Sequence, residues 1–253
     1  MFGLKDIFTT INLLGGCVAL GLCIEGEPFA ASIALVLGYL CGDSLDGWVA
    51  RMLDSANKFG ASYDSIADHM SQCIAPAAIV YTVYGGLELL PSSLGNQLLA
   101  MFLSSTIIVA GTIRHARNEV YPVEYKGVWA GMPRTVLGFI AIALANAAAV
   151  PFMPGGMWLG VVLIPLLSAA ALTRLPFPNH HMARKHVWYV RVLIGLFFLS
   201  MVTTLALAWR FVFDVLLLWM LGYSFLGWLS LDADERQAYR QAARAAAAHS
   251  ATE

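Results

Sequence analysis

The chain has 253 residues, of which 59% are hydrophobic and 12% are charged, and its mean hydropathy is +0.70. Soluble domains carry about twice that share of charged residues, so the composition excludes an ordinary soluble protein. The formal net charge of −1 and the lack of a basic run give no indication of nucleic-acid binding. We therefore expect an integral membrane protein, whose spans must be helices that satisfy their own backbone hydrogen bonds.

The apolar stretches predict about eight transmembrane helices, each close to the ~20 residues that a bilayer requires. In chain order these predicted helices cover 7–24, 28–50, 62–85, 92–113, 128–150, 155–173, 187–208 and 211–230. Short connections join them, and the alanine-rich, charged tail from Asp232 is expected to be a surface helix or a frayed end. The predicted fold is an all-α, polytopic membrane helical bundle.

Basic residues predict the orientation of the bundle, because lysine and arginine are enriched in cytoplasmic loops. The loops after the second, fourth and sixth predicted helices are basic, whereas the opposite loops contain glutamate or no charge, with Arg210 as the exception. Both termini are therefore expected on the cytoplasmic side of a bacterial-type inner membrane. The N-terminus lacks the pattern of a cleaved signal peptide, so the first helix is expected to be retained.

Four aspartates interrupt the apolar pattern at the second and third predicted helices: Asp43, Asp46, Asp64 and Asp68. At 100° per residue the first pair shares a helical face with Gly47 and Ala50, and the second pair stands one turn apart. The adjoining apolar stretches supply roughly 22 Å and 27 Å of helix, slightly less than a ~30 Å hydrocarbon core. We therefore expect all four carboxylates to converge at the cytoplasmic boundary, on adjacent antiparallel helices.

Four converging carboxylates cannot all stay ionised unless protons or cations compensate their charge. Carboxylate ligands suit hard divalent cations such as Mg²⁺ or Mn²⁺, which commonly serve phosphate chemistry. Gly47, Ala50 and Gly60 leave room for a close approach beside the acids, and Arg51 is placed to pair with a phosphate or an acid.

A cation or proton transporter is the main alternative, since acids within a membrane also mark ion paths. Transporters usually place such acids near the bilayer midplane, whereas these are expected at its boundary. A non-catalytic scaffold is a third alternative, but a scaffold has no need of clustered acids.

The spacing Asp-x2-Asp-Gly-x2-Ala-Arg-x8-Gly-x3-Asp-x3-Asp, from Asp43 to Asp68, resembles the signature of the CDP-alcohol phosphatidyltransferase family at every fixed position. Several local strings are most similar to the bacterial phosphatidylserine synthases of that family: 8–16, 59–77, 114–118, 131–133 and 175–178. The chain departs from these synthases at Trp48, at 69–73 and in the position of Asn118. These departures concern the choice of acceptor alcohol and leave the reaction class intact.

The resemblance implies a six-helix family core over 1–175, two additional C-terminal transmembrane helices over 176–231, and a cytoplasmic tail over 232–253. It implies transfer of the phosphatidyl group from CDP-diacylglycerol to L-serine, giving phosphatidylserine and CMP. Glycerol 3-phosphate, inositol phosphate and choline are the alternative acceptors. A homodimer is expected, as in relatives.

The same resemblance assigns roles to individual residues. Two divalent cations, Mg²⁺ or Mn²⁺, are expected at Asp43, Asp46, Asp64 and Asp68, and Asp68 is also expected to act as general base on the acceptor hydroxyl. The residues expected to bind the CDP-lipid are Asn12, Gly47, Ala50, Arg51, Asn57 and Gly60. A serine carboxylate suits a bidentate arginine, so the acceptor is expected at Arg114, Arg117 and Arg134, although boundary anchoring is the alternative for each.

Overall fold

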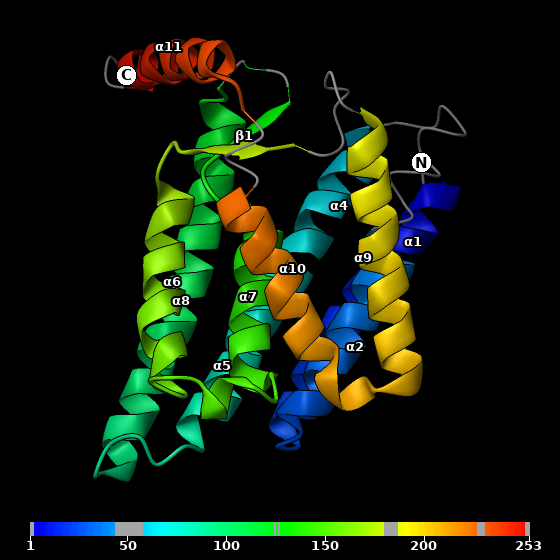
Figure 1. Ribbon diagram of the computed structural model, residues 1–253, viewed down its shortest axis with the longest axis vertical. Coiled ribbons are helices and arrows are strands. Elements are labelled where there is room, and N and C mark those ends of the chain that lie inside the picture. Colours follow the sequence, from blue (N-terminus) through cyan, green and yellow to red (C-terminus); the bar gives the residue numbers. More distant parts are fainter. Residues whose placement is uncertain are drawn as a thin grey trace. The chain divides into compact units, whose positions relative to one another are not determined.

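The computed structural model describes residues 3–43, 58–123, 125, 127–179, 187–226 and 231–250 (Figure 1). Helices make up nearly all of the regular structure in these residues, which confirms the predicted all-α class. Within the same residues the chain also forms a short antiparallel pair of strands, β1 (Val128–Ala130) and β2 (Pro176–Pro178). The chain divides into two compact units, Met1–Ile108 and Val109–Glu253.

The first unit is arranged around helix α1, Leu4–Ile24, which packs most extensively against α2, Pro28–Cys41. Helix α1 also contacts three consecutive helical segments: α4 (Lys58–His69), the π-helix η1 (Met70–Ile74) and α5 (Ala75–Gly85). These three segments together replace the single helix that was predicted over 62–85. Helix α1 is therefore the central element against which the segments carrying the acidic motif are placed.

Glycines allow α1 and α2 to approach closely. A Cβ atom on Gly15 would lie 2.7 Å from the Cα atom of Gly38, so the two backbones touch at this crossing. Gly42 follows α2 with a non-helical ψ of −93°, and a Cβ atom there would lie 2.5 Å from a backbone nitrogen of α1. Helix α2 ends at Cys41 for this reason, and the prediction of an uninterrupted helix over 28–50 is wrong at this point.

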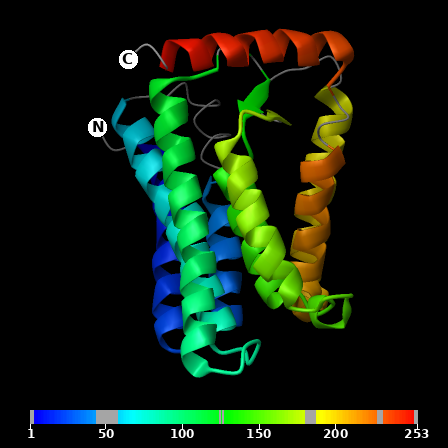
Figure 2. The same ribbon diagram turned by 90° about the vertical axis from the view of Figure 1, so that its left-hand side faces the viewer.

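The second unit contains the end of α6, which runs from Ser93 to Val120, and the described residues that follow form five further α-helices and two short 3-10 helices, Val150–Phe152 and Trp209–Phe211. The α-helices are α7 (Arg134–Asn146), α8 (Trp158–Leu172), α9 (Val187–Leu207), α10 (Val212–Leu226) and α11 (Ala233–Ser250). Helix α7 packs against α8 and α10, and α9 packs against α10. Within this unit α11 runs crosswise to α8 and α10, as Figure 2 shows in orange to red. The tail is thus a helix, and the alternative of a frayed end is wrong for 233–250.

Two predicted boundaries in the second unit need correction. The helix predicted over 128–150 begins only at Arg134, because Gly131 turns the chain with a φ of +74° and its N–H donates to the Leu175 carbonyl at 2.8 Å. Helix α6 extends to Val120, beyond the predicted end at 113. By length and composition, two described helices are able to cross a membrane, Asp6–Ile24 and Ser93–Val120. Four shorter apolar helices accompany them.

One carboxylate fixes the junction between α7 and α10. The two oxygens of Asp214, in the first turn of α10, accept hydrogen bonds from the N–H groups of Ala148 and Ala149 at 3.0 and 2.8 Å. A carboxylate in this position also interacts favourably with the helix N-terminus. Helix α10 is therefore tied to the turn after α7 by charge-assisted hydrogen bonds as well as by apolar packing.

Candidate active site

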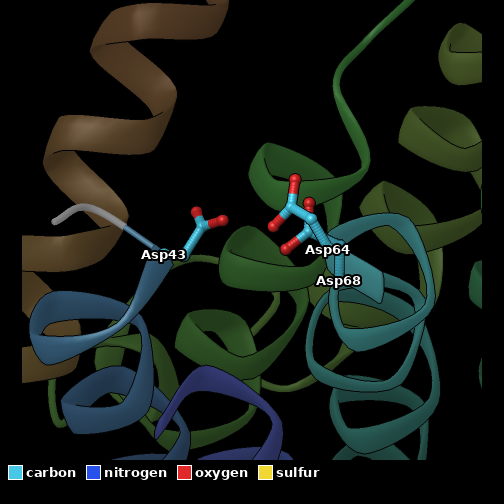
Figure 3. A group of neighbouring side chains, drawn as sticks. All are labelled: Asp43, Asp64 and Asp68. Atoms are coloured by element: carbon cyan, nitrogen blue, oxygen red, sulfur yellow. The ribbon is translucent and has the colours of Figure 1, made fainter. Parts of the chain in front are cut away.

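Three of the four motif aspartates converge in the first unit. Each of Asp43, Asp64 and Asp68 offers a carboxylate oxygen, and these three oxygens all lie within 4.8 Å of one another. Asp43 follows the end of α2, whereas the other two stand one turn apart on α4 and point toward it (Figure 3). All three side chains are half-buried. The fourth aspartate, Asp46, lies outside the described residues.

This donor set fits a hard divalent cation. Oxygen ligands bind Mg²⁺ at about 2.1 Å in octahedral geometry, which places neighbouring ligand oxygens about 3 Å apart and opposite ones about 4 Å apart. A separation of at most 4.8 Å requires only small side-chain adjustments to reach that geometry. Ionised carboxylates this close repel one another unless a cation lies between them. The residues present therefore fit the predicted metal site.

Asn12 orients one of the three aspartates. Its side chain is 1% exposed on α1, and its Nδ2 donates a hydrogen bond to Oδ1 of Asp68 at 3.1 Å. The two residues are 56 positions apart in the chain, so the pairing arises from the packing of α1 against α4. Asn12 was predicted to contact the CDP-lipid, and the structure places it beside the predicted general base.

A second polar contact holds α4 against α1. The hydroxyl of Thr10 donates to the backbone carbonyl of Asp6 at 2.7 Å, and the hydroxyl of Tyr63 lies 2.9 Å from the same Thr10 oxygen. Because Thr10 has one hydroxyl hydrogen and uses it on Asp6, we infer that Tyr63 is the donor in the second contact. Tyr63 directly precedes Asp64, so this contact fixes the start of the Asp64–Asp68 turn. Sequence reasoning missed both residues, because neither is part of the acidic spacing.

A π-helix begins immediately after the turn of α4 that carries Asp64 and Asp68. It covers Met70–Ile74 and packs against α1 where Gly16 would place a Cβ atom 3.3 Å from the Cα of Ser71. Ser71 and Gln72 are buried within it. Single π-helical turns inside longer helices are frequent at functional sites, since they shift the residues that follow to a new face. Residues 69–73 were identified from the sequence as a departure from related synthases, but the π-helical turn was not predicted.

The other residues predicted at the CDP-lipid divide into two groups. Gly60 is buried in α4, four residues before Asp64, where it adds no side-chain bulk beside the acids. Four lie outside the described residues: Gly47, Ala50, Arg51 and Asn57. Their roles stay predictions.

Arg117, one of the predicted acceptor-binding residues, is engaged with the backbone of the second unit. Its guanidinium donates to the carbonyl of Leu172, the last residue of α8, and to the carbonyl of Ala130 in β1 at 3.3 Å. It also donates to the side-chain oxygen of Asn118, whose own amide donates to Ala130 at 3.3 Å. Arg117 therefore joins α6, β1 and the C-terminal end of α8, where a cation is favourable for the helix dipole.

The other two predicted acceptor residues have a different environment. Arg114 is only 7% exposed on α6, and its Nη2 donates to the carbonyl of Gly131 at 3.4 Å. Arg134 is the first residue of α7, after the N-cap Pro133, so its charge lies at the positive end of a helix. Both arginines interact electrostatically with His115. The N-terminus of α7 with Arg134, and the charge of Arg114 close to the same histidine, make this part of the second unit favourable for an anion.

Comparison with known proteins finds a matching family model and several relatives. The family model described as CDP-alcohol phosphatidyltransferase matches residues 4–167. The CDP-diacylglycerol–serine O-phosphatidyltransferases of two Helicobacter pylori strains are 29% identical over 89% of this chain and 91% of the relative, and 28% identical over 78% and 80%. The archaetidylserine synthase of Methanothermobacter thermautotrophicus is 30% identical over 46% of this chain and 47% of the relative. Because the family model covers more than half of the chain, this protein belongs to the CDP-alcohol phosphatidyltransferase family, as the spacing of its aspartates predicted.

Proposed function

We propose that the protein transfers the phosphatidyl group of CDP-diacylglycerol to the hydroxyl of L-serine and releases CMP. Membership of the family supports transfer from a CDP-alcohol, and the activity named for the Helicobacter pylori relatives supports serine as the acceptor. The structural observation that carries the proposal is the cluster of Asp43, Asp64 and Asp68, with carboxylate oxygens within 4.8 Å of one another. Such a cluster would hold divalent cations, and bound cations neutralise the charge of a diphosphate.

The aspartates have two roles in the proposed reaction. Asp43, Asp64 and Asp68, with Asp46 as the predicted fourth ligand, would hold two divalent cations, Mg²⁺ or Mn²⁺. When bound, these cations supply charge neutralisation at the diphosphate and at the departing CMP. Asp68, oriented by the amide of Asn12, accepts the proton of the serine hydroxyl as that oxygen attacks the phosphorus of the phosphatidyl group. The bond between this phosphorus and the CMP oxygen then breaks.

The environment of the arginines supports a division of labour. We propose that Arg114 and Arg134 bind the serine carboxylate, because both lie near His115 and one stands at a helix N-terminus. Arg117 instead has a structural role, since its guanidinium donates to backbone carbonyls from β1 and α8. The proposal therefore gives acceptor binding to two of the three arginines that were predicted for it.

The setting of the enzyme follows from the same proposal. Its apolar helices support a location in the membrane, and the distribution of basic residues supports an inner-membrane protein with both termini and the aspartates on the cytoplasmic side. The family core over 1–175, the additional helices over 176–231 and the tail over 232–253 are part of the proposal, as are about eight transmembrane helices and a homodimer.

The proposed reaction is tested by the release of CMP from CDP-diacylglycerol with purified protein and Mn²⁺ or Mg²⁺. We expect release to depend on L-serine and on the metal. If CMP is released with glycerol 3-phosphate, inositol phosphate or choline but not with serine, the reaction class stands and serine is excluded as the acceptor. Metal flux into liposomes without CMP release would instead support the transporter alternative.

The acceptor site is tested by comparing three arginine variants. Arg114→Gln and Arg134→Gln should raise the KM for serine by about 10- to 100-fold, because a hydrogen-bonded charge pair contributes roughly 1.5–3 kcal/mol. Arg117→Gln should lower the melting temperature and leave the KM for serine close to the wild-type value. A raised KM in the Arg117 variant alone would contradict this assignment.

A further inference from the structure

A groove in the second unit lies between α11 and the segment that follows α8. Its volume is about 370 Å³, and four arginines line it: Arg174, Arg236, Arg240 and Arg244. Leu175 and Pro176 contribute apolar surface from the segment after α8, and alanines contribute apolar surface from α11. We call this feature the arginine groove. It combines a concentrated positive charge with apolar walls, and none of the residues proposed for phosphatidyl transfer lines it.

The groove is held in place by contacts between α11 and the rest of the second unit. The hydroxyl of Tyr239 donates to the carbonyl of Arg174 at 2.8 Å, and Nη1 of Arg174 donates to the carbonyl of Ala243 at 2.8 Å. Tyr239 and Ala243 also belong to a buried apolar cluster with Val128 and Leu231. Burial raises the pKa of Tyr239 to about 12, so its hydroxyl stays protonated and able to donate. The two walls of the groove are therefore fixed relative to each other.

The charges on α11 are separated along the helix. Arg236, Arg240 and Arg244 recur every four residues and share one face, which also carries Tyr239. None of the described residues that line the groove is acidic. Two acids at the start of α11 cap its N-terminus: the Asp232 side chain accepts from the Glu235 N–H at 2.8 Å, and the Glu235 side chain accepts from the Asp232 N–H at 3.1 Å. The residues that line the groove therefore carry a net positive charge, which favours an anionic ligand.

Arginine side chains match phosphate groups in both charge and geometry, because the guanidinium presents several donors in one plane. The apolar wall beside them suits a ligand that also has a hydrocarbon part. Helix α11 runs crosswise to α8 and α10, the orientation of an amphipathic helix that lies along a membrane surface (Figure 2). Basic residues in that position attract anionic lipids. We propose that the arginine groove binds the phosphate group of an anionic phospholipid of the surrounding membrane.

The test uses the purified full-length protein, with phosphatidylglycerol as the probe and phosphatidylcholine as the neutral lipid. Native mass spectrometry measures the affinity of each lipid, and hydrogen exchange of peptides from α11 locates the binding. The double variant Arg240→Gln, Arg244→Gln removes two exposed groove arginines. The matched control Arg191→Gln, Arg210→Gln removes two exposed arginines elsewhere in the second unit. The variant Arg240→Lys, Arg244→Lys keeps the charge and removes the planar donors.

Each basic residue near a lipid surface contributes about a 5-fold increase in affinity, so the glutamine pair should weaken phosphatidylglycerol binding by roughly 30-fold. The lysine pair should lose less affinity for phosphatidylglycerol, and the control pair should bind it as the wild type does. In the exchange experiment, phosphatidylglycerol should protect α11 only when the groove arginines are present. Equal losses in the groove and control pairs, or no loss in the groove pair, would overturn the proposal. Displacement of the lipid by millimolar inorganic phosphate or CMP would assign the groove to a soluble phosphate and likewise overturn it.

Discussion

Replacing Asp68 by asparagine separates the two roles proposed for this residue. Asparagine has nearly the same shape, and its side-chain oxygen is still able to accept the hydrogen bond that Asn12 donates at 3.1 Å to Oδ1 of Asp68. The side chain should therefore stay in place on α4. What the substitution removes is the negative charge beside Asp43 and Asp64 and the ability to accept a proton from the acceptor alcohol.

The expected magnitude follows from these two losses. A positioned general base typically contributes 10²- to 10⁴-fold to the rate, so kcat should fall by at least about 100-fold. Binding of the CDP-lipid should change much less, because Asp43 and Asp64 remain and their oxygens lie within the same 4.8 Å cluster. The melting temperature should stay close to that of the wild type, since shape and the hydrogen bond to α1 are preserved.

The assay is the release of CMP from CDP-diacylglycerol with serine, measured across a Mn²⁺ titration, together with CDP-diacylglycerol binding by calorimetry. Glu88→Gln is the matched control, because it also exchanges a carboxylate for an amide in the first unit, at an exposed position away from the cluster. If Asp68 is a general base, saturating Mn²⁺ does not restore kcat. Recovery of turnover to within about 10-fold of the wild type at high Mn²⁺ would show that Asp68 acts only as a metal ligand, and would refute the proposed base.

Three further predictions concern the scaffold. Asp214→Ala should destabilise the protein by about 1–3 kcal/mol and lower its melting temperature by several degrees, because it removes two charge-assisted hydrogen bonds to backbone N–H groups; an unchanged melting temperature would contradict this. Gly131→Ala should lower the free energy of unfolding by at least about 2 kcal/mol, because φ is +74° and the new Cβ would lie 2.4 Å from a backbone oxygen of α8. In the same thermal unfolding assay the control Gly222→Ala should be neutral or stabilising, because nothing lies within 4 Å of its new Cβ. Gly15→Val should lower both CMP release and stability by forcing α1 away from α2. Gly21→Val, on the same helix with nothing within 4 Å of its new Cβ, should leave CMP release unchanged. Equal effects of the two variants would show that the close crossing at Gly15 is not the cause of the lost activity.

Local regularities in the sequence predicted much of this protein. Helical class follows from long apolar stretches, because a backbone in lipid must satisfy its own hydrogen bonds. The stacking of Asp64 and Asp68 follows from a separation of four residues, which is one helical turn. The spacing from Asp43 to Asp68 also predicted the family, and the match over 4–167 confirms it.

Helix interruptions were harder to predict than helix class. The end of α2 before Asp43 depends on Gly42 meeting the backbone of α1, and the start of α7 depends on the turn at Gly131. The π-helix over Met70–Ile74 lies within a stretch whose apolar pattern resembles an ordinary helix. The features at Gly42 and Gly131 depend on neighbours that are distant in the chain, so a local pattern does not contain them.

By itself, the sequence determined the residue types of the acidic site, their spacing along each helix and the reaction class that they serve. Only the tertiary structure decided which distant groups meet. In the first unit Asn12 lies beside Asp68 and Tyr63 beside Thr10, and in the second unit Arg117 donates to carbonyls of β1 and α8. The physical reason is the range of the forces involved. Helix formation and side-chain phase depend on residues within one or two turns, whereas these contacts depend on how closely whole helices pack, which small residues such as Gly15 permit.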